Sequence, residues 1–398
     1  MRDVYILGVG QTKRGWWPGR SLGSLAAEAG WTAVDDAKIE MTQVEQGWFG
    51  HYNPSASQQT TSGQVIVEAL GLSAKAGVRN VEHACATGGI ALHDARLAVA
   101  SGIYDIVIAL AAAKTHDSQL ARNTNETISY DAYSVNRGVM IGHSDFEGYC
   151  KEFGIGDREI YGWYEIEYWN AVRNPVSVCY RDERGFLSFE QYCNLPTNYW
   201  WSAPIRFGAG STSVDGASAI VLGTKDWAKR TGRPLIKIAG MGFFNESPYY
   251  PHSYRHVHFE MMTCPSVGNS FKHALKEAGI AASDVELYQP HANTPYITAA
   301  HLDAFLPMFD SSIPYGYALK WYSSGEAKRG GRLPLNTAGT AKCGYIMAAN
   351  FLDNNIENVR QLRGDVVEPE RQLQFKKGIA MASVSPERTV VSILRREE

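Results

Sequence analysis

Short runs of apolar residues alternate along the chain with longer segments in which apolar residues recur every three or four positions. The short runs predict buried strands, as at residues 4–10 and 104–110. The longer segments predict helices with one buried face, as at residues 22–38. Strands that alternate with helices in this way are typical of the α/β class, with the strands in a buried sheet.

The same succession of elements is predicted twice. A strand at 234–240 leads to a helix at 267–278, which repeats the order of the first strand and the first helix. Each of the two helices is followed by a similar short segment, Thr42-Gln43-Val44-Glu45 in one case and Ser283-Asp284-Val285-Glu286 in the other. Two similar halves would place a site at their junction, near the ends of strands.

The second parts of the two halves also match. A buried helix is expected after Cys85, followed by the strand at 104–110. A long helix is expected after Asn336, as far as about Leu362. The strands expected after that helix are at 377–384 and 389–394.

We place the boundary between the halves in a short polar turn near residue 230. Residues 1–230 are then the N-terminal half and residues 231–398 the C-terminal half. Residues 115–200 have no counterpart in the second half, so we expect a helical insertion there that covers the site.

Composition narrows the class of protein. Of the 398 residues, 44% are hydrophobic and 20% are charged, as in ordinary globular enzymes, and the formal net charge is -3. No block of basic residues is present, so we expect no nucleic-acid partner. The longest apolar run, residues 106–113, is too short to cross a bilayer, and the first residues resemble a strand rather than a signal peptide. We therefore expect a cytoplasmic protein with no membrane partner.

The cysteines agree with this expectation. Six are scattered without a Cys-x-x-Cys pair, which argues against a zinc ribbon in this chain and against a disulfide framework. A reducing compartment fits this usage best. His252, His256 and His258 are close in sequence, but no second set of ligands with zinc spacing accompanies them, so we expect no metal.

One cysteine stands out by its surroundings. Cys85 lies between two alanines, and Gly88-Gly89 and an apolar-periodic segment follow it. A cysteine at the mouth of a buried helix faces unpaired backbone N–H groups and the positive end of the helix dipole, which favour the nucleophilic thiolate. A buried, inert cysteine at a tight turn fits the local pattern equally well.

Four segments resemble the thiolase superfamily, in the order found in that family, and the resemblance covers nearly the whole chain. The segments are His83-Ala84-Cys85-Ala86-Thr87-Gly88-Gly89, Ala171 with Asn174-Pro175, Ser213-Val214-Asp215-Gly216-Ala217-Ser218-Ala219 and Leu333-Pro334-Leu335-Asn336-Thr337-Ala338-Gly339. The sterol-carrier-type thiolases are the nearest broad group. The resemblance implies the thiolase fold, with two similar stacked α/β halves and a helical loop insertion, and usually a homodimer. It also implies that Cys85 is the nucleophile.

Two usual motifs of the family are altered. A Gly-His-Pro motif usually follows the turn that contains Asn336, but Ala341-Lys342-Cys343-Gly344-Tyr345-Ile346 stands there. The late Cys-x-Gly motif, which supplies the usual acid/base cysteine, is replaced by Ala382-Ser383-Val384-Ser385. Tyr288-Gln289-Pro290-His291-Ala292-Asn293 resembles the histidine motif of the ketoacyl synthases in the same superfamily. Cys85 is therefore expected to work with substituted partners.

Three residues are candidates for this substituted set. His291 follows a predicted strand and could donate to a thioester oxygen or exchange a proton. Cys343 could replace the acid/base cysteine, and Tyr345, near the place of the missing histidine, could donate a hydrogen bond. Two of these residues also have a structural interpretation. His291 could be a histidine whose hydrogen bonds are satisfied at the end of a strand, and Cys343 could be a small buried residue at the start of a helix.

The resemblance implies thiolytic cleavage of a 3-ketoacyl-CoA, or the reverse acyl transfer, with coenzyme A as a substrate. A thiolate attacks the keto carbon, donors stabilise the oxyanion, and an acid/base group protonates the leaving enolate and later deprotonates CoA. No nucleotide-binding fingerprint follows a strand, so the residues that hold CoA are not located by sequence. Ordinary packing explains the many aromatic residues best, but they could also line an interface or the pocket of an aromatic substrate, so they weakly favour an aromatic acyl group.

Superfamily members with altered sites suggest alternatives. Thiolase-like subunits such as that of the benzoylsuccinyl-CoA thiolases work with a small accessory subunit that has an OB-fold and a zinc ribbon, and such a partner is a candidate here. Steroid side-chain aldolases use tyrosines instead of a cysteine, so a lyase with Tyr345 and His291 is one alternative. A non-catalytic scaffold for a partner is another. The retained Cys85 favours the thiolase.

Overall fold

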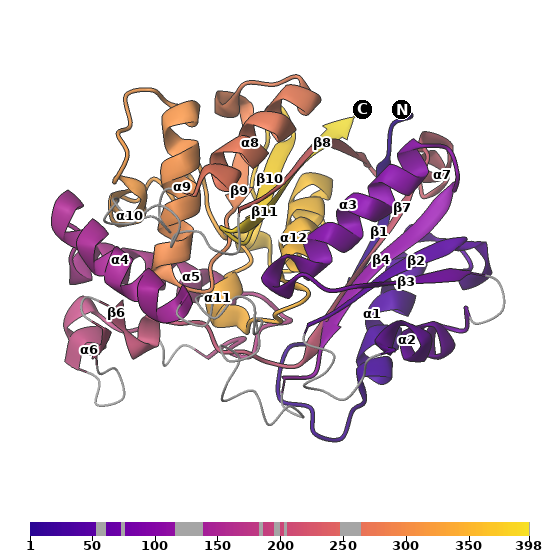
Figure 1. Ribbon diagram of the computed structural model, residues 1–398, viewed down its shortest axis with the longest axis horizontal. Helices are drawn as coiled ribbons and strands as arrows, with labels where there is room; N and C mark the ends of the chain where they lie inside the picture. The colour runs from indigo at the N-terminus through magenta and orange to yellow at the C-terminus, as the bar shows by residue number, and fades with distance from the viewer. Residues whose placement is uncertain are drawn as a thin grey trace.

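Strands and helices alternate along the chain as the apolar pattern predicts (Figure 1). The computed structural model describes residues 1–52, 61–72, 76–115, 138–182, 186–194, 200–202, 205–246 and 264–397. The strands are β1 (Tyr5–Gln11), β2 (Gln46–His51), β3 (Gly77–Val81), β4 (Ile106–Ala113), β5 (Trp200–Ser202), β6 (Ile205–Arg206), β7 (Gly216–Gly223), β8 (Leu235–Asn245), β9 (Leu287–Gln289), β10 (Ile379–Val384) and β11 (Arg388–Glu397). The α-helices are α1 (Leu22–Ala37), α2 (Ser62–Leu70), α3 (Thr87–Ala100), α4 (Gly138–Phe153), α5 (Asp157–Ala171), α6 (Phe189–Asn194), α7 (Lys225–Arg230), α8 (Pro265–Ala278), α9 (Pro295–Phe309), α10 (Ala318–Ser323), α11 (Thr340–Cys343) and α12 (Asn350–Arg363).

Nine strands of the described chain form one sheet, in the order β3-β2-β4-β7-β1-β8-β11-β10-β9. In the first half, β2 runs parallel to β4, and β7 pairs in antiparallel fashion with β4 and β1. The second half repeats this order, since β9 runs parallel to β10, and β11 pairs in antiparallel fashion with β10 and β8. An antiparallel contact between β1 and β8 joins the two sets. The α/β class and its two similar halves are confirmed, and the boundary near residue 230 stays a prediction.

Two buried helices, α3 and α12, lie side by side against one face of this sheet (Figure 1). Their apolar residues share a core with residues of strands from both halves. On the opposite face, α1 and α2 cover the first half, and α8 and α9 cover the second. The first turn of α3 reaches the other half, because the backbone N–H of Gly88 donates to the carbonyl of Ala348 at 2.9 Å. The turn that contains Cys85, directly before α3, is therefore held where the two halves meet.

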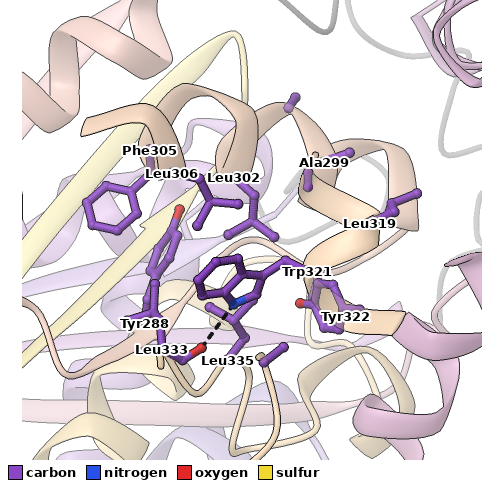
Figure 2. Packing of buried hydrophobic residues seen from close by; sticks show 14 of the residues in the cluster. Tyr288, Ala299, Leu302, Phe305, Leu306, Leu319, Trp321, Tyr322, Leu333 and Leu335 are labelled. Carbon is purple, nitrogen blue, oxygen red and sulfur yellow. Dashed lines mark hydrogen bonds between the residues drawn. The ribbon is translucent and has the colours of Figure 1, made fainter. Parts of the chain in front are cut away.

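The second half has an aromatic core on its outer face. Phe305 of α9 and Trp321 of α10 pack around Tyr288 of β9 (Figure 2). The indole N–H of Trp321 donates to the carbonyl of Leu333 at 3.4 Å, so the polar group of this buried ring has a partner. The backbone of Tyr288 donates to Pro334 at 3.1 Å. This core therefore fixes the segment that leads into α11.

Glycines let an outer helix approach a central strand closely in both halves. A Cβ on Gly10 of β1 would lie 2.2 Å from the carbonyl oxygen of Ala29 in α1. A Cβ on Gly242 of β8 would lie 2.0 Å from the carbonyl oxygen of Ser270 in α8. Contacts this short are sterically forbidden, so glycine is required at both places.

The helix predicted from after Asn336 to about Leu362 is wrong in its first part. The four-residue helix α11 comes first, and α12 begins only at Asn350. Asn336 and Gly344 have positive φ angles of 46° and 108°, which an α-helix does not accommodate. The irregular segment between α11 and α12 carries Tyr345.

The region predicted as a helical insertion, residues 115–200, contains α4, α5 and α6. Helix α5 packs against α10 and α11 of the second half. Among the described residues, no helix is long and apolar enough to cross a membrane.

We predict that Gly242→Val lowers the free energy of unfolding by about 1–3 kcal/mol, because the added atoms push α8 away from β8. The matched control is Gly268→Ala in α8, since the Cβ added there meets nothing within 4 Å. This change should raise stability by about 0.5–1 kcal/mol through helix propensity. Urea denaturation measures both. Equal stability of Gly242→Val and the unaltered protein would contradict the close packing.

Candidate active site

Cys85 lies in a tight turn, the 3₁₀ helix Ala84–Ala86, directly before α3. Ala84 adopts a left-handed φ of 49°. The hydroxyl of Thr87 accepts from the backbone N–H of His83 at 2.8 Å and donates to the carbonyl of Ala84 at 2.7 Å, which holds this strained conformation. Cys85 is half-buried at the mouth of a buried helix, as the sequence predicts.

A chain of hydrogen bonds leads from the second half of the protein to this thiol. The backbone N–H of Ser385 donates to Nδ1 of His291 at 3.1 Å. Nε2 of His291 lies 2.8 Å from the hydroxyl of Tyr345. That hydroxyl is hydrogen-bonded to the thiol of Cys85. The structure thus brings together Cys85, Tyr345 and His291, three of the four predicted site residues.

The direction of these hydrogen bonds follows from the state of the histidine. Burial lowers the pKa of His291 to about 3, so the imidazole is neutral near pH 7. A neutral imidazole has one donor and one acceptor nitrogen. Because Nδ1 accepts from Ser385, Nε2 carries the hydrogen and donates to the oxygen of Tyr345. His291 is therefore a donor to Tyr345 in this arrangement, and not a proton acceptor.

The backbone of Tyr345 is held by one of the family-like segments. Its N–H donates to Thr212 at 2.8 Å, and its carbonyl accepts from Val214 at 3.1 Å. Gly344, with its positive φ, turns the chain before Tyr345 and packs against Val178 and Val214. Burial raises the pKa of the Tyr345 hydroxyl well above its ordinary value, so the hydroxyl keeps its proton.

Two other family-like segments contact each other near the site. The side-chain amide of Asn170 donates to the carbonyl of Asn336 at 3.1 Å. The amide of Asn174 donates to the carbonyl of Ala338 at 3.0 Å. These hydrogen bonds connect the insertion to the turn that precedes α11. Asn336 shapes that turn by adopting a left-handed φ.

The expectation that the helix terminus favours a thiolate at Cys85 is not met. Burial raises the pKa of the Cys85 thiol, and this effect exceeds the opposite effects of the Tyr345 hydrogen bond and of the positive charge of Arg388. The negative charge of Glu387 acts in the same direction as burial. The resting residue is therefore a thiol, which loses its proton only when a reaction drives the loss.

Cys343 is not part of this group in the structure. It is fully buried and interacts with Ser177 and with the guanidinium of Arg14. Burial raises the pKa of its thiol to about 11. Its carbonyl accepts from the backbone of Val178 at 2.9 Å. These contacts fit the structural interpretation of Cys343, and its role as a base stays a prediction.

Sequence reasoning missed three contributors near the thiol. Tyr52 and Arg388 interact electrostatically with Cys85, and the backbone of Ser385 orients His291. One signal was available for Tyr52, because it follows β2 in the first half as His291 follows β9 in the second. Ser385 lies in the segment that replaces the late Cys-x-Gly motif, which signals its place near the site but not its contact with His291. Arg388 carries no such signal, since it resembles an ordinary strand residue.

Within the part of the chain that the structure describes, no group of three or more His, Cys, Asp or Glu side chains could hold a metal ion. His252, His256 and His258 lie outside the described residues.

Two models of one family match the chain. Residues 8–148 match the thiolase N-terminal domain, and residues 251–385 match the thiolase C-terminal domain-like model. Together these matches cover more than half of the sequence in the order of the two halves. The chain belongs to the thiolase superfamily.

Three relatives cover nearly the whole chain. An acetyl-CoA acetyltransferase of Methanothermobacter thermautotrophicus is 26% identical, and the match covers 92% of this chain and 92% of the relative. The benzoylsuccinyl-CoA thiolase subunit BbsB of Thauera aromatica is 26% identical over 96% of this chain and 94% of its own. The 17-hydroxy-3-oxo-4-pregnene-20-carboxyl-CoA lyase of Mycobacterium tuberculosis is 25% identical over 92% of both. The relatives thus include both acyltransferases and a lyase.

Two solved structures share the fold. The Ltp2-ChsH2(DUF35) aldolase matches with a TM-score of 0.78 and 20% identity over 99% of this chain and 98% of that chain. The Acat5 thiolase from Ascaris suum, solved in complex with coenzyme A, matches with a TM-score of 0.71 and 14% identity over the full length of both chains. These matches confirm the α/β thiolase fold.

We predict that Tyr345→Phe raises the pKa of Cys85 further, because the donor that stabilises the thiolate is removed. At a fixed pH below that pKa, alkylation of Cys85 by iodoacetamide should slow by about 10- to 100-fold, the usual contribution of a hydrogen bond to a charged group. Mass spectrometry of the Cys85 peptide over a range of pH measures this rate apart from the other thiols.

The control is Tyr288→Phe, which removes another buried hydroxyl that is bonded to Ser383 and not to Cys85. It should leave the alkylation profile of Cys85 unchanged. Identical profiles for Tyr345→Phe and the unaltered protein would disprove the hydrogen bond.

Proposed function

We propose that this chain is a thiolase that cleaves a 3-ketoacyl-CoA with coenzyme A, or runs the reverse acyl transfer, through an S-acyl intermediate on Cys85. The observation that carries the proposal is the hydrogen-bonded chain from Ser385 through His291 and Tyr345 to Cys85. This arrangement supports the proposal, because the Tyr345 hydroxyl is oriented by His291 and acts on the thiol of Cys85.

The hydrogen-bonding capacity of Tyr345 fits an acid/base role. A tyrosine hydroxyl has one hydrogen and two acceptor lone pairs. The Nε2–H of His291 occupies one lone pair, which leaves the hydrogen and one lone pair for Cys85 and the substrate. A hydroxyl in this state accepts a proton from one group while it donates its own proton to another.

In the first half-reaction, the sulfur of Cys85 attacks the keto carbon C3, and the bond between C2 and C3 breaks. The electron pair of that bond remains on C2 as the enolate of the shorter acyl-CoA. Tyr345 accepts the thiol proton of Cys85 and delivers its own proton to C2. The proton lost by sulfur balances the proton gained by carbon, so no further base is required.

In the second half-reaction, the thiol of CoA attacks the carbonyl carbon of the S-acyl group. The bond between this carbon and the sulfur of Cys85 breaks. Tyr345 accepts the proton of the CoA thiol and returns its own to Cys85, which restores the resting site. The positive end of α3 stabilises the oxyanion that forms in both steps.

The comparisons support the substrates and partners in this proposal. A thiolase of the same fold was solved with coenzyme A, and the Ltp2 aldolase was solved with ChsH2(DUF35). We propose that this chain uses CoA, forms a homodimer and works with a small accessory subunit of the OB-fold, zinc-ribbon kind. The aromatic acyl group suggested by composition stays a prediction.

A lyase of the aldolase kind is the second candidate. The observation that favours it is the presence of Tyr345 itself at the site, together with a lyase and an aldolase among the similar proteins. In such a lyase, Tyr345 would exchange a proton with the substrate, and Cys85 would form no bond to it.

We predict that incubation with 3-ketoacyl-CoA substrates of several chain lengths adds the mass of one acyl group to the Cys85 peptide. Cys85→Ala should abolish this adduct and lower turnover by about 10³-fold or more, because the covalent intermediate is lost. Tyr345→Phe should retain slow acylation but lower turnover by about 10²- to 10⁴-fold, as expected for loss of general acid–base catalysis. Intact and peptide mass spectrometry, with a steady-state assay, measures these effects.

Each alternative has its own outcome. A Cys85→Ala variant that keeps most of its activity, while Tyr345→Phe loses it, would identify the lyase. An absence of both adduct and turnover, even with the co-purified accessory subunit present, would identify a non-catalytic scaffold.

A further inference from the structure

Arg388 lies at the rim of the site, as the first residue of β11. Side chains alternate along a strand, so Arg388 projects to the same face as Val390. Val390 packs against the first turn of α3, since a Cβ added to Gly89 would lie 3.0 Å from the side chain of Val390. The side chain of Arg388 therefore points toward the layer that contains Cys85, at the end of the sheet from which Ser385 orients His291.

The neighbours of Arg388 confirm this placement. Its backbone is in register with Asn245, whose side-chain oxygen lies 3.2 Å from Nε2 of His83, two residues before Cys85. Its charge acts on the thiol of Cys85 and on the hydroxyl of Tyr52. The side chain is half-buried.

Arg388 has no carboxylate partner in the part of the chain that the structure describes. Glu387 accepts a hydrogen bond from the hydroxyl of Ser385 at 3.4 Å, and Glu82 accepts one from the backbone of Ala84 at 2.9 Å. Both nearby carboxylates are thus engaged elsewhere. A half-buried cation without a partner costs free energy unless a ligand supplies the opposite charge.

The other charges of the proposed reaction do not require Arg388, since the positive end of α3 stabilises the oxyanion and Tyr345 protonates the enolate. The phosphates of CoA lie at the far end of the pantetheine arm when the thioester is at Cys85, so they are remote from Arg388. The sulfur of Cys85 takes its hydrogen bond from Tyr345, whose effect on the thiol exceeds that of Arg388. The acyl group remains, and a guanidinium presents paired donors that match a carboxylate.

We propose that Arg388 binds a free carboxylate carried by the acyl group, so that the substrate class is CoA thioesters of 3-keto dicarboxylic acids. This inference rests on the proposed function of the site and specifies its substrate.

The kinetic test uses two substrates of equal carbon number, 3-oxoadipyl-CoA and 3-oxohexanoyl-CoA, which differ by a carboxylate in place of a methyl group. The unaltered protein should prefer the dicarboxylic substrate in kcat/KM. Arg388→Gln should lower kcat/KM on both substrates, because its charge also acts on the thiol of Cys85, but the loss on the dicarboxylic substrate should be about 10- to 100-fold larger, as expected for a charge-assisted hydrogen bond. Arg388→Lys should keep part of the preference. Arg396→Gln, an exposed arginine at the far end of β11, is the matched control and should change neither value.

A binding test separates this inference from the proposed reaction. In Cys85→Ala, which cannot be acylated, calorimetry should show succinyl-CoA binding about 10-fold or more tightly than butyryl-CoA, and Arg388→Gln in that background should remove the difference. Equal loss on both kinetic substrates, or equal affinity for both thioesters, would overturn the inference. A binding preference without any acyl adduct in the unaltered protein would instead overturn the proposed reaction and leave the carboxylate site standing.

Discussion

The hydrogen bond from the backbone N–H of Ser385 to Nδ1 of His291 determines the chemistry of the whole site. It makes Nδ1 the acceptor, so Nε2 donates to Tyr345, and burial prevents the imidazole from taking a second proton. In the proposed mechanism, His291 is therefore a positioning residue that orients the oxygen of Tyr345. Among substitutions of Ser385, only proline removes this backbone donor, so the orientation of His291 is a property of the turn after β10.

The repeated halves explain how distant residues reach one thiol. His291 follows β9 and Ser385 follows β10, and these strands run parallel, so both residues lie at the same end of the sheet. Cys85 comes from the first half, and the contact between Gly88 and Ala348 holds it against the segment that carries Tyr345. The close packing allowed by Gly10 and similar glycines fixes the helices on the outer face, and α3 and α12 fill the inner one.

The α/β class, the repeat and the position of Cys85 could be predicted because they depend on local periodicity and on small residues around one thiol. The break before Tyr345 could not, since the positive φ of Gly344 is stabilised by strands and turns far away in sequence. The position of Arg388 depends on the register of β11 with β8, which no local pattern encodes. The protonation state of Cys85 could not be predicted either, because a helix terminus is visible in the sequence and burial is not.

In the proposed site, a tyrosine takes the place of the usual acid/base residues, and this changes the charge of the resting site. Burial raises the pKa of both Cys85 and Tyr345, so the site rests as a thiol and a hydroxyl, both neutral. A thiolate would compete for the positive charge of Arg388 and would repel an anionic acyl group, as Coulomb's law requires at short distance. A neutral thiol does neither. In the proposed mechanism, the burial that keeps Cys85 protonated therefore leaves Arg388 available to a carboxylate, and the free-energy cost of deprotonating the thiol falls on the step in which Tyr345 would move the proton to carbon.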